Sequence, residues 1–302
     1  MTGTVLVTGA GGRHGGTGTH LTQRLLEQGV PVRILVRRES DASRALRTLG
    51  VDVVLGDLHD RRTLEPALDG VEQAYFAYPV AGGVTSAAAN WAEAIRRTGR
   101  PIRTVVMSMG PAHPEHPSAL GREQWLAEEV LRWAGIDVFV LRIMALFHEN
   151  LPLLHGRSLA GDAVIRTAFG ASALSWINGS DAAELAACAL LRPELFDGAL
   201  AEIPGTELRT HQEIADVLTG VLGKPVRFEP IGVAEWRDEL TAIAEGALNA
   251  DMAAHIPNVA AGVLRRGTRM TPDPDRYAEL TGRKPVTLAS YLESIKHTLV
   301  PG

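Results

Sequence analysis

The sequence of 302 residues contains a single cysteine, Cys188, and no apolar run long enough to cross a membrane. One cysteine cannot form a disulfide within the chain, and its alanine-rich surroundings, DAAELAACALL, predict a small buried position on a helix. The most apolar stretch, AGIDVFVLRIMALF, is interrupted by Asp137 and Arg142 and is too short to span a bilayer. We therefore expect a cytoplasmic protein that does not associate with membranes.

The sequence also lacks a strong excess of charge. Its formal net charge is −5 and 22% of its residues are charged, a balance that gives no indication of nucleic-acid binding. No internal repeat and no concentrated glycine or proline linker is present. The loop PAHPEHPS carries His113 and His116, but prolines flank both and no third ligand is evident, so we expect no metal site.

The most informative segment that is present is VLVTGAGGRHGGTGTHL, residues 5–21. A short apolar strand leads into glycines and then into a helix whose apolar face carries Leu21, Leu25 and Leu26. Glycines in such a turn allow the backbone to approach a pyrophosphate, and the following helix N-terminus favours an anion. A tight turn in any α/β protein is the alternative interpretation. The predicted cofactor-binding residues of this turn are Thr8, Gly9, Gly12, Arg13, His14 and Gly15.

The second predicted strand, PVRILVRRES, ends in Arg37 and Arg38. In a dinucleotide-binding fold an acidic residue here would bind the ribose hydroxyls of NAD, whereas arginine accommodates the additional phosphate of NADP. The sequence therefore predicts NADP(H) in preference to NAD(H). Two exposed arginines that only solubilise a strand end are the alternative.

Apolar runs alternate with helical patterns through the first half of the chain, near residues 5–7, 33–36, 51–57, 73–79, 103–109 and 137–143. This alternation predicts an α/β fold with a doubly wound parallel Rossmann sheet. Ligands bind at the carboxyl ends of the strands of such sheets. The further cofactor-binding candidates at strand ends are Asp57, Leu58, Ala77, Tyr78, Pro79 and Ser108.

The pattern becomes less regular beyond Asn150. We expect an NADP-binding domain over residues 1–150 and a smaller C-terminal α/β substrate-binding region over residues 151–302. Residues 176–205 are expected to pack back on the first domain, with a helix that begins near Asp181, Ser180 as its cap, and a short strand near 201–203.

Five phrases resemble the NmrA-like group of atypical short-chain dehydrogenases/reductases: VTGAGGRHGG, LVRRE, GDLHD, LRIMALFHEN, and the late pair GKPVRFEPI and TGRKPVTLASYLE. They extend over nearly the whole chain, and the HEN and TGRKP phrases are the more particular to the group. The resemblance implies an NADP-binding Rossmann core and a small domain that forms the substrate cleft. It also implies either an NADPH-dependent quinone reductase or an NADPH sensor.

One departure from the related reductases concerns the helix after the fifth strand. Most short-chain reductases carry a catalytic tyrosine and lysine there. In this chain the helix reads SALGREQWLAEEVL, with Leu120 at the tyrosine position and Gln124 at the lysine position. Residues that could substitute as catalytic groups are His148, His113, Ser108, Tyr78 and Gln124, although loop residues without a role are the alternative.

Several charged and aromatic residues on or near the same helix are predicted to have structural roles. Glu128 and Glu129 are interpreted as a solvated helix face, and Trp125 and Trp133 as packing residues. Arg142, at the end of an apolar strand, requires a carboxylate or phosphate partner.

Three functions agree with the sequence. The first is an NADPH-dependent oxidoreductase that transfers hydride to a small quinone, enone or carbonyl substrate. The second is a non-catalytic NADP(H)-sensing regulatory protein, and the third a redox-neutral isomerase, cyclase or lyase. A monomer and a homodimer both stay open.

Overall fold

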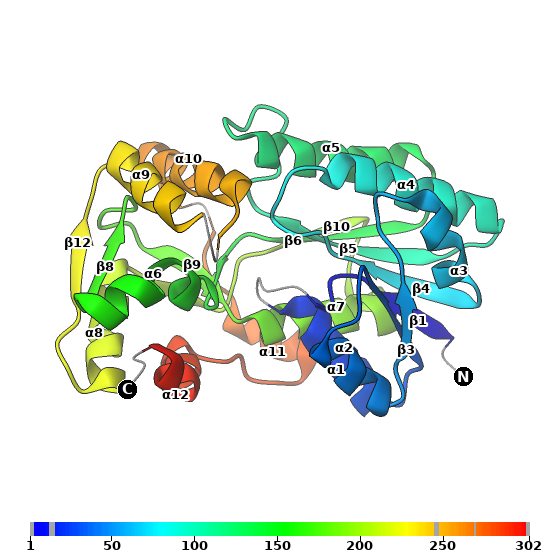
Figure 1. Cartoon of the computed structure of the whole chain (residues 1–302), viewed down its shortest axis with the longest axis horizontal. Coiled ribbons are helices and arrows are strands. Elements are labelled where there is room, and N and C mark those ends of the chain that lie inside the picture. Colours follow the sequence, from blue (N-terminus) through cyan, green and yellow to red (C-terminus); the bar gives the residue numbers. More distant parts are fainter. Residues whose placement is uncertain (1–2, 12–15, 245–247, 269, 300–302) are drawn as a thin grey trace. The chain divides into compact units, whose positions relative to one another are not determined.

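The computed structural model describes residues 3–11, 16–244, 248–268 and 270–299, and it divides the chain into two units (Figure 1). Unit 1 holds residues 1–116, 121–143 and 179–203, and unit 2 holds residues 117–120, 144–178 and 204–302. Unit 1 therefore consists of three segments that are separated in the sequence by two parts of unit 2.

Unit 1 is built on a seven-stranded sheet in which every pair of neighbouring strands is parallel, in the order β10-β6-β5-β4-β1-β2-β3. These strands are β1 (Thr4–Val7), β2 (Val32–Val36), β3 (Asp52–Leu55), β4 (Val71–Phe76), β5 (Arg103–Met109), β6 (Val138–Ile143) and β10 (Leu200–Ile203). The order reverses between β1 and β4, so the carboxyl ends of these two strands border the crevice where such sheets bind ligands. The predicted doubly wound parallel fold is confirmed.

Helices cover both faces of this sheet, and most residues of its central strands β1, β4, β5 and β6 are buried. Figure 1 shows α4 and α5 along one face and α1 and α7 along the other. The helices of unit 1 are α1 (Thr17–Glu27), α2 (Asp41–Thr48), α3 (Leu64–Leu68), α4 (Val84–Thr98), α5 (Ala119–Trp133) and α7 (Gly179–Leu191), with short 3₁₀ turns at Arg61–Thr63 and Pro193–Leu195. Leu6, Phe76, Trp91, Val106 and Leu131 are at most 1% exposed in the core beneath α3, α4 and α5.

Unit 2 contains two small sheets. One has the order β11-β9-β7 and the other pairs β12 with β8. The strands are β7 (Leu146–Phe147), β8 (Val164–Thr167), β9 (Leu174–Ile177), β11 (Glu207–Arg209) and β12 (Arg227–Pro230). The helices are α6 (Asn150–Gly161), α8 (His211–Leu222), α9 (Val233–Ile243), α10 (Ala250–Arg266), α11 (Pro274–Thr281) and α12 (Leu288–Leu299).

Two local predictions are wrong. Helix α7 begins at Gly179, so Ser180 lies within the helix and is not the residue before it. Trp133, the last residue of α5, is 68% exposed, so its side chain does not pack into the core. The predicted burial of Cys188 is confirmed, and burial raises the pKa of its thiol. Among the described residues, no helix combines the length and hydropathy that a bilayer crossing requires.

Candidate functional site

The carboxyl ends of β1 and β4 are joined by one buried threonine. The Thr8 hydroxyl donates to the Ala77 carbonyl oxygen at 2.9 Å and accepts from the Ala77 N–H at 2.8 Å. The turn after β1 is therefore fixed against the residues that follow β4. This junction is the position at which a doubly wound sheet binds a dinucleotide.

Two glycines give this turn its close packing. Gly9 has φ +75°, and a Cβ there would lie 3.2 Å from the Ala77 Cβ. Gly18, in the first turn of α1, is more restricted, because its Cβ would lie 2.6 Å from the Gly9 carbonyl carbon and 2.7 Å from the Ala10 nitrogen. Gly18 therefore allows the helix to approach the strand turn. Gly18 was not among the predicted cofactor-binding residues, although it continues the three-residue spacing of Gly9, Gly12 and Gly15.

Replacing Gly18 by alanine is expected to lower the thermal stability of the protein. The atoms that the new methyl group meets are backbone atoms, which cannot rotate away, and overpacking of this kind costs about 1–3 kcal/mol. The control is Gly220→Ala in α8, where nothing lies within 4 Å of the added Cβ and alanine should stabilise the helix. Calorimetric melting of both variants tests the contrast; equal melting temperatures would contradict it.

The predicted residues Gly12, Arg13, His14 and Gly15 lie outside the described residues. Arg37 and Arg38 are described and exposed, just beyond the carboxyl end of β2. Neither forms an ion pair with another described residue, whereas neighbouring arginines such as Arg44 and Arg47 do. Two guanidinium groups are thus available at this strand end.

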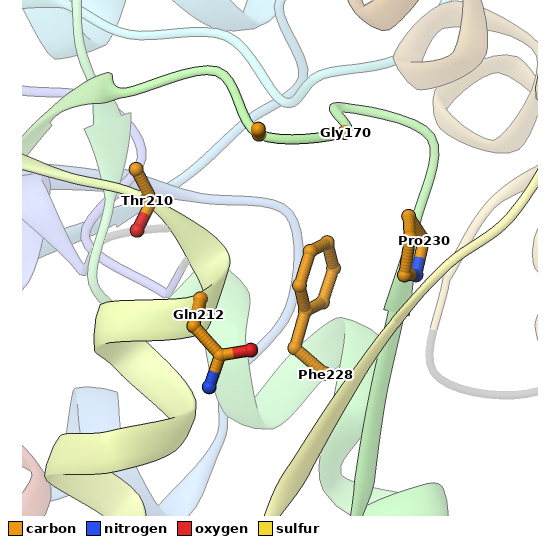
Figure 2. A pocket seen from close by; sticks show the side chains of 6 residues that line it. Gly170, Thr210, Gln212, Phe228 and Pro230 are labelled. Atoms are coloured by element: carbon orange, nitrogen blue, oxygen red, sulfur yellow. The ribbon is translucent and has the colours of Figure 1, made fainter.

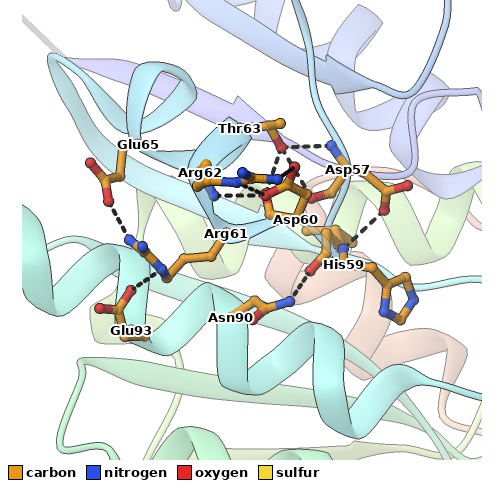
Figure 3. A network of polar contacts seen from close by, with 10 residues as sticks. Asp57, His59, Asp60, Arg61, Arg62, Thr63, Glu65, Asn90 and Glu93 are labelled. Atoms are coloured by element: carbon orange, nitrogen blue, oxygen red, sulfur yellow. Dashed lines mark hydrogen bonds and ion pairs between the residues drawn. The ribbon is translucent and has the colours of Figure 1, made fainter.

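The residues after β3 form a turn fixed by polar contacts (Figure 3). The Asp57 carboxylate accepts from the His59 N–H at 2.9 Å, and the Asp57 N–H donates to the Thr63 hydroxyl at 2.9 Å. The Leu58 carbonyl oxygen accepts from the Asn90 amide of α4, also at 2.9 Å. Both predicted residues, Asp57 and Leu58, therefore lie in an ordered turn attached to α4.

The end of β5 contains a buried charged network. Ser108 donates its hydroxyl hydrogen to Glu128 at 2.5 Å, and Glu128 also pairs with Arg142 at 2.5 Å. Glu128 is 0% exposed, so its predicted place on a solvated helix face is wrong. The carboxylate partner predicted for Arg142 is confirmed, and Glu202 is a second one at 3.1 Å. Burial opposes the charge of Arg142, but the two carboxylates outweigh it and raise its pKa.

The other catalytic candidates of unit 1 lie in different environments. Gln124 is 9% exposed on α5, one turn before Glu128. His113 is exposed, and its Nδ1 accepts from the Glu115 N–H at 3.1 Å. No group of three or more histidine, cysteine or acidic side chains is placed to hold a metal ion within the described parts of the chain. The catalytic roles of these residues stay predictions.

Comparison with known proteins extends the agreement from the fold to the family. The model of the NmrA-like family matches residues 1–256. The chain belongs to the NmrA-like family.

Two curated relatives of this NmrA-like chain are reductases by name. A (4-alkanoyl-5-oxo-2,5-dihydrofuran-3-yl)methyl phosphate reductase of Streptomyces griseus is 30% identical over 92% of this chain and 93% of the relative. An NAD(P)H azoreductase of Xenophilus azovorans is 27% identical over 93% of this chain and 96% of the relative. The structure is also similar to the NADPH complex of the NADPH-dependent quinone oxidoreductase QOR2 of Escherichia coli. That match has a TM-score of 0.78 and 23% identity, and it covers 97% of this chain and 99% of the other.

In unit 2 the HEN phrase and the TGRKP phrase contact each other. His148, from the HEN phrase, has its ring centroid 5.6 Å from that of Tyr291, from the TGRKP phrase. His148 Nε2 lies 3.0 Å from Glu207 Oε1, and the Leu288 N–H donates to the same oxygen at 2.6 Å. His148 is 0% exposed, and the contact with Glu207 meets the distance of an ion pair but not the geometry of a hydrogen bond, so neither ring nitrogen has a hydrogen-bond partner among the described residues. The His148 ring has no surface exposed to solvent from which a substrate could reach it, and its catalytic role stays a prediction.

Unit 2 also contains a cavity of about 320 Å³ at the start of α8. Figure 2 shows the Phe228 ring between Gln212 and Pro230, with Gly170 on the loop beside them. The lining is mainly apolar, and Thr210 is engaged in the capping box of α8 with Glu213. None of the described residues that line the cavity carries a charge that would define a ligand.

Proposed function

We propose that this protein is an NADPH-dependent oxidoreductase that reduces a small quinone, enone or carbonyl compound. The observation that carries the proposal is the glycine-lined junction of β1 and β4, at which Thr8 ties the strand ends together and Gly9 and Gly18 leave no room for side chains. The names of the two curated relatives support a reductase, and one of them is an NAD(P)H enzyme.

The residues of this edge fit a nicotinamide dinucleotide. A pyrophosphate requires a backbone that it can approach closely, which Gly9 supplies, and the N-terminus of α1 adds an electrostatic attraction for phosphate. Asp57 and Leu58 follow β3, where the adenosine half of a dinucleotide is held in folds of this type. A bound NADPH would supply a hydride.

The preference for NADP(H) rests on Arg37 and Arg38. An exposed guanidinium without an ion pair can bind a phosphate by donating two parallel hydrogen bonds to it. It loses no existing partner when it does so. No acidic residue precedes Glu39 at this strand end, and Glu39 itself pairs with Arg47 at 2.6 Å. The site therefore favours the phosphorylated ribose over the free hydroxyls.

The chain's own residues restrict how a proton can reach the substrate. Helix α5 has neither tyrosine nor lysine, and the hydrogen of the Ser108 hydroxyl is already donated to Glu128. Ser108 can therefore accept a hydrogen bond from a substrate but is a poor donor to it. This favours substrates that accept hydride readily, with the proton taken from solvent.

The same feature favours a second candidate function, a protein that binds NADP(H) without turnover. A site without the tyrosine and lysine pair binds the cofactor but lacks the usual acid. Oxidation of NADPH in the presence of quinones, enones, carbonyl compounds and azo dyes, together with a binding titration, separates the two candidates. Turnover supports the oxidoreductase, and tight binding without turnover supports the sensor.

Replacing Arg37 by alanine is expected to weaken NADPH binding by about tenfold, the value of one charged hydrogen bond to phosphate, and to change NADH binding little. Arg44→Ala is the control, because Arg44 is also exposed but pairs with Asp41 within α2. Fluorescence titration of each variant with both cofactors is the measurement. An equal loss for NADPH and NADH would contradict the assignment of NADP(H).

A further inference from the structure

Three side chains of unit 1 form a hydrogen-bonded chain at the carboxyl edge of the sheet. His59 Nε2 lies 2.7 Å from the Tyr78 hydroxyl oxygen, and His59 Nδ1 lies 3.2 Å from the Ser86 hydroxyl oxygen. The two rings meet edge to face, with centroids 5.7 Å apart at 81°. The Tyr78 hydroxyl oxygen also lies 3.1 Å from the Gly82 carbonyl oxygen, and the Ser86 hydroxyl oxygen lies 2.9 Å from that of Gly83, so both hydroxyl groups are held at the turn before α4.

This chain of contacts links two parts of the sheet that are not neighbours. His59 follows β3 and Tyr78 follows β4, and both β1 and β2 lie between those strands. The Asn90 amide makes a second connection when it donates to the Leu58 carbonyl oxygen. In a doubly wound fold the half that contains β3 holds one nucleotide and the half that contains β4 holds the other. The His59–Tyr78 contact therefore places the Tyr78 hydroxyl group, which comes from the β4 half, against the turn after β3, on the adenosine side of the crevice.

Gly83 leaves room for this connection. Its φ is +99°, and a Cβ there would lie 2.9 Å from His59 Cε1 and 3.0 Å from the Tyr78 hydroxyl oxygen. The Gly83 N–H donates to the Glu123 carboxylate of α5 at 2.9 Å. Because the turn is fixed on both sides, the rings of His59 and Tyr78 are held in one arrangement.

The His59 ring is nevertheless exposed. Fixing an exposed side chain costs conformational entropy, and the His59 ring buries too little surface within unit 1 to offset that cost. A ring held at both nitrogens, open to solvent and adjacent to the turn of Asp57 and Leu58 is preorganised for a ligand that covers it.

We propose that His59, Tyr78 and Ser86 form a clamp that contacts the adenosine half of NADP(H) and holds it against the turn after β3. This inference rests on the proposed function, because it concerns the same cofactor. Tyr78 and His59 are the residues in contact with the adenosine, and Ser86 is a positioning residue that orients the His59 ring. The clamp contributes affinity for the cofactor and takes no part in proton transfer.

The test uses Tyr78→Phe, which keeps the ring and removes the hydroxyl group, together with His59→Leu and Ser86→Ala. Each variant is titrated with NADPH, with adenosine 2′,5′-bisphosphate and with reduced nicotinamide mononucleotide. The maximal rate at saturating NADPH and the melting temperature are also measured. Arg62→Gln is the control, because Arg62 is 81% exposed in the same segment and pairs with Asp60.

The clamp requires Tyr78→Phe and His59→Leu to raise the Kd of both NADPH and the bisphosphate by about three- to tenfold, the range for one or two hydrogen bonds. Ser86→Ala should have a smaller effect in the same direction. Binding of the mononucleotide should stay at the value of Arg62→Gln and the wild type, and each variant should still melt in one transition that shows it to be folded.

Two results would overturn the clamp. One is an unchanged Kd for the bisphosphate in all three folded variants. The other is a fall in the maximal rate of Tyr78→Phe at saturating NADPH with unchanged affinity, which would make Tyr78 a proton donor. Failure of the oxidoreductase proposal would be distinct, since the variants would still lose bisphosphate binding while the wild type reduced no acceptor.

Discussion

Replacing Glu128 by leucine is expected to lower the free energy of unfolding of unit 1 by about 3–5 kcal/mol, the usual cost of removing one partner from a buried ion pair. Glu128 is 0% exposed and accepts from Ser108 and Arg142. Leucine fills a similar volume but leaves the Arg142 guanidinium with only the half-exposed Glu202. Urea unfolding followed by tryptophan fluorescence measures the loss.

The adjacent Glu129→Leu provides the matched control. Glu129 belongs to the same helix and pairs with Arg132, but its side chain is 23% exposed, so its loss should cost at most about 1 kcal/mol. The double variant Glu128→Leu/Arg142→Met should recover most of the stability, because apolar replacement of both charges removes the unpaired cation. Equal losses in Glu128→Leu and Glu129→Leu would refute the interpretation of the network.

The doubly wound sheet could be predicted from the sequence because its strands are mainly apolar runs, as in RILV and FVLRI, and alternate with helical patterns. The different burial of the adjacent residues Glu128 and Glu129 was not predicted. Glu128 continues the buried positions Leu120, Gln124 and Leu131 at helical spacing, while Glu129 lies off that stripe. The helical period of α5 therefore indicates that Glu128 is buried, although its charge favours an exposed position.

The contacts of unit 2 could not be predicted in this way, because they join residues far apart in the sequence. The Glu207 carboxylate meets His148 and the backbone of Leu288, and Tyr291 lies beside the same histidine. Composition and periodicity describe neighbours within one element and carry no information about such pairs. The same applies to His59 and Tyr78, whose strands are not adjacent in the sheet.

Acidification from pH 7 to pH 5 is expected to destabilise unit 2 by about 4 kcal/mol, about 2 kcal/mol for each of two buried histidines. Burial lowers the pKa of His211 to about 4. Burial and the neighbouring His211 lower that of His155 to about 3. The two side chains are 2% and 3% exposed, and the His211 ring stacks on Phe169 at 5.4 Å.

The direction follows from the proton uptake of the two states. Below the ordinary pKa of 6.5 the unfolded chain binds a proton on each histidine, whereas the folded unit keeps both neutral until the pH approaches about 4. Stability is therefore complete above pH 6.5 and falls as the pH decreases through this window. The double variant His155→Leu/His211→Phe, which keeps an aromatic ring beside Phe169, should lose less than about 1 kcal/mol over the same change.

A control variant and the pKa of Glu207 separate this effect from the titration of other groups. His297→Gln replaces an exposed histidine of α12 and should retain the full acid sensitivity of the wild type. Burial raises the pKa of the Glu207 carboxyl, but His148 and the Leu288 N–H outweigh it and lower the pKa below its ordinary value of 4.5. The stability that Glu207 contributes is therefore lost only below pH 4.5, outside the measured window. The measurement is the urea midpoint of each protein at pH 7 and pH 5. If the midpoint of the double variant falls as much as that of the wild type, His155 and His211 are not the source of the acid sensitivity.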